Sequence, residues 1–206
     1  MESPEARSGR QSIPPIEPSG FTPQLADALR PRIERLGYLG EFFKRAAHQP
    51  EALLSFIAFT EDLKRALPDN LTEVVALTVA NRLKNDYERH QHERLCRKLG
   101  FTDEWIRGAS RAGSAAALPP LERSVQALVI AVIERSGHGV TTELAAVGDT
   151  LGPAQVMAIL MLIGRYTTHS LIVNALSLTP PVPSIFAAEA GAPQPGGGLI
   201  RRPGDP

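Results

Sequence analysis

The spacing of apolar residues constrains the fold of this chain more than any other feature. Between residues 21 and 186, apolar residues recur mostly at steps of three and four, for example from Leu53 to Ile57 and from Phe59 to Leu63. Such steps place side chains on one face of an α-helix, whereas a half-buried strand needs strict alternation. The sequence has no alternating stretch of useful length. It therefore predicts an all-α fold.

The predicted helices fall into nine segments, and several carry start or stop signals. Pro50 and Pro153 suit the first turn of a helix, where a missing N–H costs nothing. Thr102 is predicted to cap the helix that follows it, and Gly100 to end the helix before it. The segments are Pro23–Leu36, Leu39–Ala47, Pro50–Leu67, Leu71–Arg82, Asp86–Leu99, Asp103–Arg111, Pro119–Ser136, Thr142–Thr150 and Pro153–Ser177.

The two ends of the chain differ in composition from the region between them. Residues 1–20 and 187–206 are rich in proline, glycine, serine and charge, which predicts two disordered tails around a single helical domain at residues 21–186. The N-terminus lacks the apolar core of a secretory signal. The most apolar stretches are too short and too interrupted to cross a bilayer. We therefore expect no membrane partner.

Charge and cysteine content narrow the classes of function. The chain has 22 basic and 22 acidic residues, so it lacks the basic excess of a nucleic-acid-binding protein. Cys96 is the one cysteine among 206 residues, which excludes an intramolecular disulfide and a Cys-x-x-Cys redox motif. A chain without disulfides suits a reducing compartment, and we predict a cytoplasmic location.

One stretch combines side chains suited to acid–base chemistry. Asn85, Glu88, His92 and Cys96 follow one another at steps of three, four and four, so they line one face of a helix. A carboxylate and an imidazole on one face can exchange protons, because histidine titrates near neutral pH. Glu73, on the preceding helix, can join them if the chain reverses near residues 81–84.

Several of these residues also have purely structural interpretations. Asn85 with Glu88, and Asn70 with Glu73, match the spacing of a capping box, in which side chains bind backbone N–H groups at a helix start. Capping and catalysis are compatible with each other. Tyr87 suits either a pocket hydroxyl or the hydrophobic core.

The other histidines and the cysteine give little sign of a metal or thiol site. His90 and His92 are two residues apart, so on a helix they point in different directions and chelate poorly; we predict no metal. His169 is interpreted as a surface or interface residue, with the pocket wall as the alternative. Cys96 has no second thiol as a partner, which favours a core residue and argues against a thiol peroxidase.

A longer part of the sequence resembles a known family. The segment from Phe42 to Phe101 contains the run Ala46–Ala52, then Glu73 near a helix start, then Tyr87-Glu88-Arg89-His90-Gln91-His92. The stretch IGRYTTHSLIVNALSLTPP resembles the closing helix of the same family. Together these features resemble the carboxymuconolactone decarboxylases of the alkylhydroperoxidase-D-like superfamily.

Two departures from the family pattern bear on the chemistry. The redox branch of the superfamily carries cysteines where this sequence has Asn85 and Glu88, so the resemblance implies proton transfer rather than sulfur chemistry. Arg89 stands where the family usually has tryptophan, which introduces a fixed cation.

The resemblance implies an alkylhydroperoxidase-D-like helical bundle and a specific activity. That activity is cofactor-independent decarboxylation of a small unsaturated carboxylic acid or lactone by acid–base catalysis, in a homo-oligomer that is a trimer or hexamer. The implied catalytic residues are His92, Glu88 and Glu73, and the implied substrate-binding residues are Tyr87, Arg89 and Asn85. The alternatives are an isomerase or other proton-transfer enzyme on the same scaffold, and a non-catalytic ligand-binding oligomer. Convergence of the three catalytic residues on a pocket would favour an enzyme.

Overall fold

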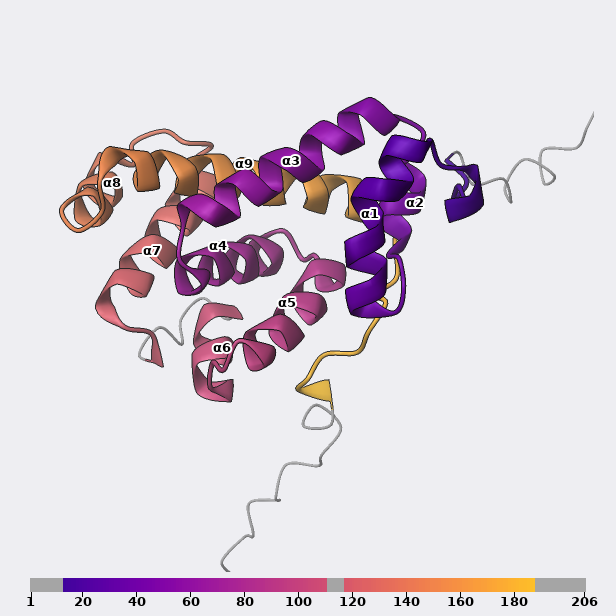
Figure 1. Cartoon of the computed structure of the whole chain (residues 1–206). Coiled ribbons are helices and arrows are strands. Elements are labelled where there is room, and N and C mark those ends of the chain that lie inside the picture. The colour runs from indigo at the N-terminus through magenta and orange to yellow at the C-terminus, as the bar shows by residue number, and fades with distance from the viewer. Residues whose placement is uncertain (1–12, 111–116, 188–206) are drawn as a thin grey trace, which may run out of the picture.

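The computed structural model describes residues 13–110 and 117–187, which form a bundle of α-helices (Figure 1). A short 3-10 helix, η2 (Pro18–Gly20), precedes them. The helices are α1 (Pro23–Leu36), α2 (Glu41–Ala46), α3 (Pro50–Ala66), α4 (Asp69–Arg82), α5 (Asp86–Lys98), α6 (Asp103–Ser110), α7 (Pro120–Glu134), α8 (Thr141–Gly148) and α9 (Pro153–Ala175). No strand is present in the described ranges.

The all-α prediction is confirmed, and each predicted helix is present within two residues at each end. The exception is the end predicted at Arg111, which lies outside the described residues. Thr102 caps α6 as expected, because its hydroxyl accepts a hydrogen bond of 3.2 Å from the N–H of Trp105. Gly100 follows α5 with a φ of +91°, a conformation that glycine adopts without strain.

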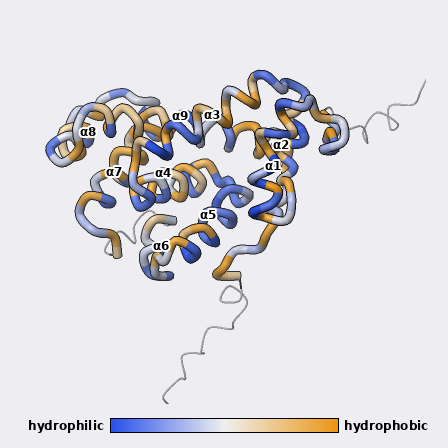
Figure 2. Tube along the Cα trace, in the orientation of Figure 1, coloured by the Kyte–Doolittle hydropathy of each residue, from blue (hydrophilic) through white to orange (hydrophobic). Residues whose placement is uncertain are grey.

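Helix α4 lies at the centre of the bundle. Its ten residues from Leu71 to Ala80 are all buried, and it packs against α5, α6, α7 and α9. A helix that is buried on all sides is a core helix, yet the third residue of this buried run is the charged Glu73. Figure 2 shows the contrast with the neighbouring α5, which is mostly hydrophilic. The polar groups that α5 buries therefore need partners inside the protein.

A second, smaller core joins the N-terminal helices to α5. Leu25 and Leu29 of α1, Phe42 of α2 and Leu53 of α3 pack there, and α5 contributes Tyr87. Tyr87 accepts a hydrogen bond of 3.3 Å from the N–H of Phe42. Helix α5 contributes to both cores: Tyr87 packs in the smaller core and Cys96 in the larger one.

The described chain begins before the predicted domain boundary. The N–H of Ile16 donates to the carbonyl oxygen of Lys44 at 3.0 Å, and His48 Nε2 lies 2.8 Å from the carbonyl oxygen of Pro14. Residues 13–20 therefore pack on α2, and the packed part starts earlier than the boundary predicted at residue 21. The rest of the predicted tails, residues 1–12 and 188–206, lies outside the described residues.

The longest helix, α9, combines a buried and an exposed side. By length and composition alone it could cross a membrane, but half of its most apolar window is buried inside the protein. A central helix of a soluble domain passes the same test. After α9 the chain turns back and runs along α5 towards α6 (Figure 1).

Candidate active site

The turn between α4 and α5 brings the two central helices together. The chain reverses at residues 83–85, where Lys84 has a φ of +53°. Asn85 then caps α5: its side-chain oxygen accepts from the N–H of Glu88 at 3.1 Å, and its amide donates to Ser170 Oγ at 2.9 Å. The capping interpretation of Asn85 is therefore correct. The reversal expected at residues 81–84 occurs one or two residues later and places Glu73 opposite His92.

The site is built around His92, which lies between two carboxylates. Its Nδ1 is 2.6 Å from Glu73 Oε2, and its Nε2 is 3.5 Å from Glu88 Oε1. Glu73 is 2% exposed, and Glu88 and His92 are each 7% exposed. The structure thus brings together the three side chains that the sequence pattern marked as catalytic. Neither glutamate closes a capping box: Asn70 instead donates to Glu122 at 2.8 Å.

The two carboxylates change the protonation of His92. Burial alone would lower the pKa of this imidazole, but the charge of Glu73, its hydrogen bond, and the same contributions from Glu88 outweigh burial and raise the pKa to about 9. His92 is therefore an imidazolium at neutral pH. It can donate a proton and regain one from solvent.

Helix α9 supplies three residues of the site that the sequence pattern did not mark as catalytic. Arg165 Nη1 is 3.0 Å from Glu88 Oε1, and its Nε donates to Thr60 Oγ1 at 3.0 Å. His169 is 2% exposed, with its Nε2 3.4 Å from Glu88 Oε2. The expectation of a surface or interface role for His169 is therefore wrong. The Tyr166 ring meets the His92 ring edge-on, with centroids 5.3 Å apart.

Glu88 is held as a carboxylate by this arrangement. Burial would raise its pKa, but His169, the hydrogen bond from His92, and the charge of Arg165 hold that pKa well below its usual range. Burial in turn lowers the pKa of His169 to about 4, which makes it neutral at pH 7. At that pH the neutral His169 has its Nε2 3.4 Å from Glu88 Oε2, and the positive charge beside Glu88 comes from His92 and Arg165.

The three residues predicted to bind substrate lie outside the cavity next to His92. Asn85 is the buried cap of α5, and Tyr87 belongs to the second core. Arg89 pairs with Asp86 at 2.6 Å and with Glu93 at 3.0 Å. None of the three lines the cavity. Tyr87 and Arg89 flank Glu88, and consecutive helix residues point in directions about 100° apart, so their side chains turn away from this cavity.

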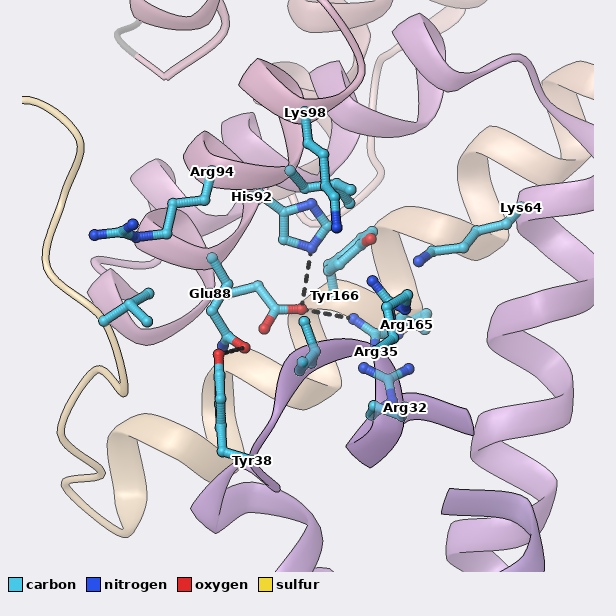
Figure 3. A pocket seen from close by; sticks show the side chains of 14 residues that line it. Arg32, Arg35, Tyr38, Lys64, Glu88, His92, Arg94, Lys98, Arg165 and Tyr166 are labelled. Carbon is cyan, nitrogen blue, oxygen red and sulfur yellow. Dashed lines mark hydrogen bonds and ion pairs between the residues drawn. The ribbon is translucent and has the colours of Figure 1, made fainter. Parts of the chain in front are cut away.

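The cavity has a volume of about 330 Å³ and opens beside His92 and Glu88 (Figure 3). Six cationic side chains line it: Arg32, Arg35, Lys64, Arg94, Lys98 and Arg165. Burial lowers the pKa of both Arg32 and Lys64. Within the described part of the chain, Arg35, Lys64 and Lys98 make no hydrogen bond or ion pair. A cavity with this much unpaired positive charge is suited to an anion.

The surroundings of Cys96 and His90 bear on thiol and metal chemistry. Cys96 is fully buried, with its sulfur 3.6 Å from Glu73 Oε2, and burial raises the pKa of its thiol far above the usual range. It is therefore the core residue that the sequence indicated. His90 turns away from His92, towards the carbonyl oxygen of Val182. Among the described residues, no group of three His, Cys, Asp or Glu side chains is arranged to hold a metal ion.

Comparison with known proteins identifies the fold. No protein-family model matches the sequence, and no curated protein matches it. Among solved structures, the chain is similar to an uncharacterised peroxidase-related protein with an alkylhydroperoxidase AhpD core from Ralstonia eutropha JMP134. The identity is 15%, the match covers 84% of this chain and 94% of that one, and the TM-score is 0.73.

Two further structures match almost as well. The debrominase Bmp8, in complex with 2,3,4-tribromopyrrole, is 14% identical over 83% of this chain and 92% of that one, with a TM-score of 0.72. An uncharacterised peroxidase-related protein from Silicibacter sp. TM1040 is 16% identical over 82% and 90%, with a TM-score of 0.71. The chain thus has the alkylhydroperoxidase-D-like helical fold shared with carboxymuconolactone decarboxylases, as the resemblance in its sequence implied.

Proposed function

We propose that the protein is a small-molecule enzyme in which His92 transfers a proton to or from an anionic substrate. One observation carries this proposal. An imidazolium, held between Glu73 and Glu88, faces a cavity of about 330 Å³ lined by cationic side chains. A buried group with a strongly shifted pKa beside a cavity is typical of a catalytic acid or base.

The reaction that fits best is decarboxylation of a small unsaturated carboxylic acid or lactone. Loss of carbon dioxide breaks a carbon–carbon bond and leaves its electron pair on the substrate as a conjugated enolate. The imidazolium of His92 then delivers its proton to carbon and becomes neutral. After product release, His92 takes a proton from water, so the cycle needs no oxidant or reductant.

The cationic lining supports this chemistry if its side chains stabilise the negative charge that develops on the substrate during the reaction. Cations placed on the departing carboxylate would stabilise the substrate more than the transition state, because the carboxylate loses its charge as carbon dioxide forms, and they would give no acceleration. Cations placed on the developing enolate oxygen lower the barrier. Lys64 and Arg165 are the candidates for that oxygen, because both line the cavity on the side near the Tyr166 ring (Figure 3).

A thiol peroxidase is a poor fit to this chain. That cycle needs a reactive thiolate and a second thiol, and the sequence has one cysteine, whose sulfur is buried against a carboxylate. An isomerase or other proton-transfer enzyme would use the same residues and remains the second candidate. A non-catalytic ligand-binding oligomer would leave the raised pKa of His92 without a role.

The test is a screen of small unsaturated acids and lactones in deuterated water, with the His92→Gln variant beside the parent protein. The proposal expects carbon dioxide release, deuterium at carbon in the product, and loss of turnover in His92→Gln. His138→Gln is the matched control, because His138 is exposed in the loop before α8 and should leave turnover unchanged.

Other outcomes of the screen select the alternatives. Deuterium exchange without carbon dioxide release would favour the isomerase. Ligand binding without either reaction would favour the non-catalytic oligomer. Full turnover in His92→Gln would show that the proton donor has been assigned wrongly.

A further inference from the structure

The segment that follows α9 forms part of the wall of the cavity. Residues 179–187, here called the C-terminal strap, run back along α5 (Figure 1). Val182 of the strap lines the cavity. Arg94 of α5 also lines it (Figure 3). Arg94 Nε donates to the carbonyl oxygen of Pro183 at 3.2 Å. The strap therefore contributes one wall residue and holds a second.

Four consecutive strap residues are bonded to α5. His90 Nδ1 lies 3.1 Å from the carbonyl oxygen of Val182, and Pro183 is held by Arg94. The other two residues bind Glu93: Ser184 Oγ donates to its Oε2 at 2.6 Å, and the N–H of Ile185 donates to the same oxygen at 3.3 Å. Prolines at positions 180, 181 and 183 stiffen the strap, because each fixes its own φ.

Glu93 is the most deeply buried of these partners. It is 0% exposed and does not line the cavity. Its Oε1 accepts from Arg89 at 3.0 Å, and Arg89 is fixed in turn by Asp86 at 2.6 Å. A buried carboxylate is costly unless both oxygens are bonded. Because two of its three donors come from the strap, Glu93 favours the docked strap over a released one.

The far end of the strap has its own anchor. The Phe186 ring packs beneath the guanidinium of Arg107, whose central carbon is 4.2 Å from the ring centroid. Glu93 thus fixes the strap between its cavity end, at Val182, and its aromatic end, at Phe186. Arg89, expected from the sequence to contact substrate, instead orients the residue that holds the wall.

We propose that Glu93 is a positioning residue that locks the strap in place, so that Val182 and Arg94 shape the cavity and set which anions fit. This role of Glu93 rests on the proposed function in one respect, namely that the cavity is the site where substrate binds. It concerns binding and needs no turnover.

The test compares Glu93→Gln with the parent protein by hydrogen exchange and by binding of maleate, a small unsaturated dicarboxylate. Glutamine keeps the size of the side chain but removes its charge. Exchange at the Ile185 amide should become about tenfold faster. The maleate Kd should rise about tenfold, the equivalent of about 1.4 kcal/mol. Ser184→Ala, which removes one donor outside the helical core, should shift both quantities the same way by a smaller factor.

Glu51→Gln is the matched control, because Glu51 is exposed on α3 and should change neither quantity. Both measurements are made on folded protein below its melting temperature, where a merely structural role of Glu93 would leave the maleate Kd unchanged. Unchanged exchange at Ile185 would overturn the lock, and faster exchange with an unchanged Kd would overturn its effect on the cavity. A parent protein that does not bind maleate would overturn it too. Absence of His92-dependent turnover would instead count against the proposed function and leave these results standing.

Discussion

Replacing Glu73 by glutamine should lower the pKa of His92 and so measure how much this carboxylate contributes to the raised pKa. The ordinary histidine pKa is 6.5, and the site raises it to about 9. That difference corresponds to roughly 3 kcal/mol in favour of the imidazolium. Glu73 contributes more than Glu88, because its oxygen lies 2.6 Å from the ring rather than 3.5 Å. With Glu73 neutral, burial opposes a single carboxylate, and the pKa should fall by about 1 unit or more.

The shift should also be visible in stability. Because the pKa of His92 is raised in the folded protein, its contribution is fully present below pH 6.5 and is lost as pH rises from there through about 9. The free energy of unfolding of the parent protein should therefore fall over that window by up to roughly 3 kcal/mol. In the Glu73→Gln variant this fall should be smaller by about 1.4 kcal/mol or more.

The assay is an NMR titration of the histidine ring protons, together with urea unfolding at several pH values. The chain has five histidines, and His169, with a pKa near 4, should titrate at the opposite end of the range from His92. Glu51→Gln serves as the exposed control. A parent His92 that titrates near pH 6.5, or a midpoint unmoved in Glu73→Gln, would refute the electrostatic account of the site.

Two further predictions concern stability and assembly. The Tyr166 hydroxyl is buried without a hydrogen-bond partner in the described residues, so Tyr166→Phe should raise the free energy of unfolding by about 1 kcal/mol in urea titrations. Tyr87→Phe removes the acceptor of the Phe42 N–H and should lower the free energy of unfolding by a similar amount. Equal losses of stability in the two variants would contradict this prediction. Met157 and Met161 are 55% and 44% exposed on an uncharged stripe of α9, so we expect a homo-oligomer whose assembly Met161→Glu disrupts. Light scattering that gives a single-chain mass for the parent protein would contradict this prediction.

The helices could be predicted from the sequence because local signals define them. Proline at the first turn marks the starts of α3 and α9, and Thr102 and Gly100 mark the boundary between α5 and α6. The central place of α4 is a different kind of property. Its residues are buried on every side, so it has no apolar stripe that would show which face meets which neighbour.

The candidate site could be predicted only in part, because sequence spacing fixes a helix face but not what the face meets. Glu88 and His92 share a face, and that face does point at Glu73. Tyr87 is one residue from Glu88 but about 100° around the helix, which turns it into the other core. Arg165 lies 77 residues from Glu88, and only tertiary packing joins them. One signal was available: Arg165 is the single charged residue in the 23 residues of α9.

The balance of charge in the site indicates which residues bind the charge of the substrate. The carboxylates of Glu73 and Glu88 face the imidazolium of His92 and the guanidinium of Arg165, so the charges of this inner group cancel. A group whose charges cancel costs less to bury than one that leaves a charge unpaired. The uncompensated charge lies in the rest of the cavity lining, on Arg32, Arg35, Lys64, Arg94 and Lys98. Of these, Arg32 has its nearest carboxylate, that of Glu61, 4.0 Å away. Substitutions in that outer set, apart from Lys64, should therefore change affinity for anions, whereas substitutions of Lys64 and of the inner group should change the rate of the reaction.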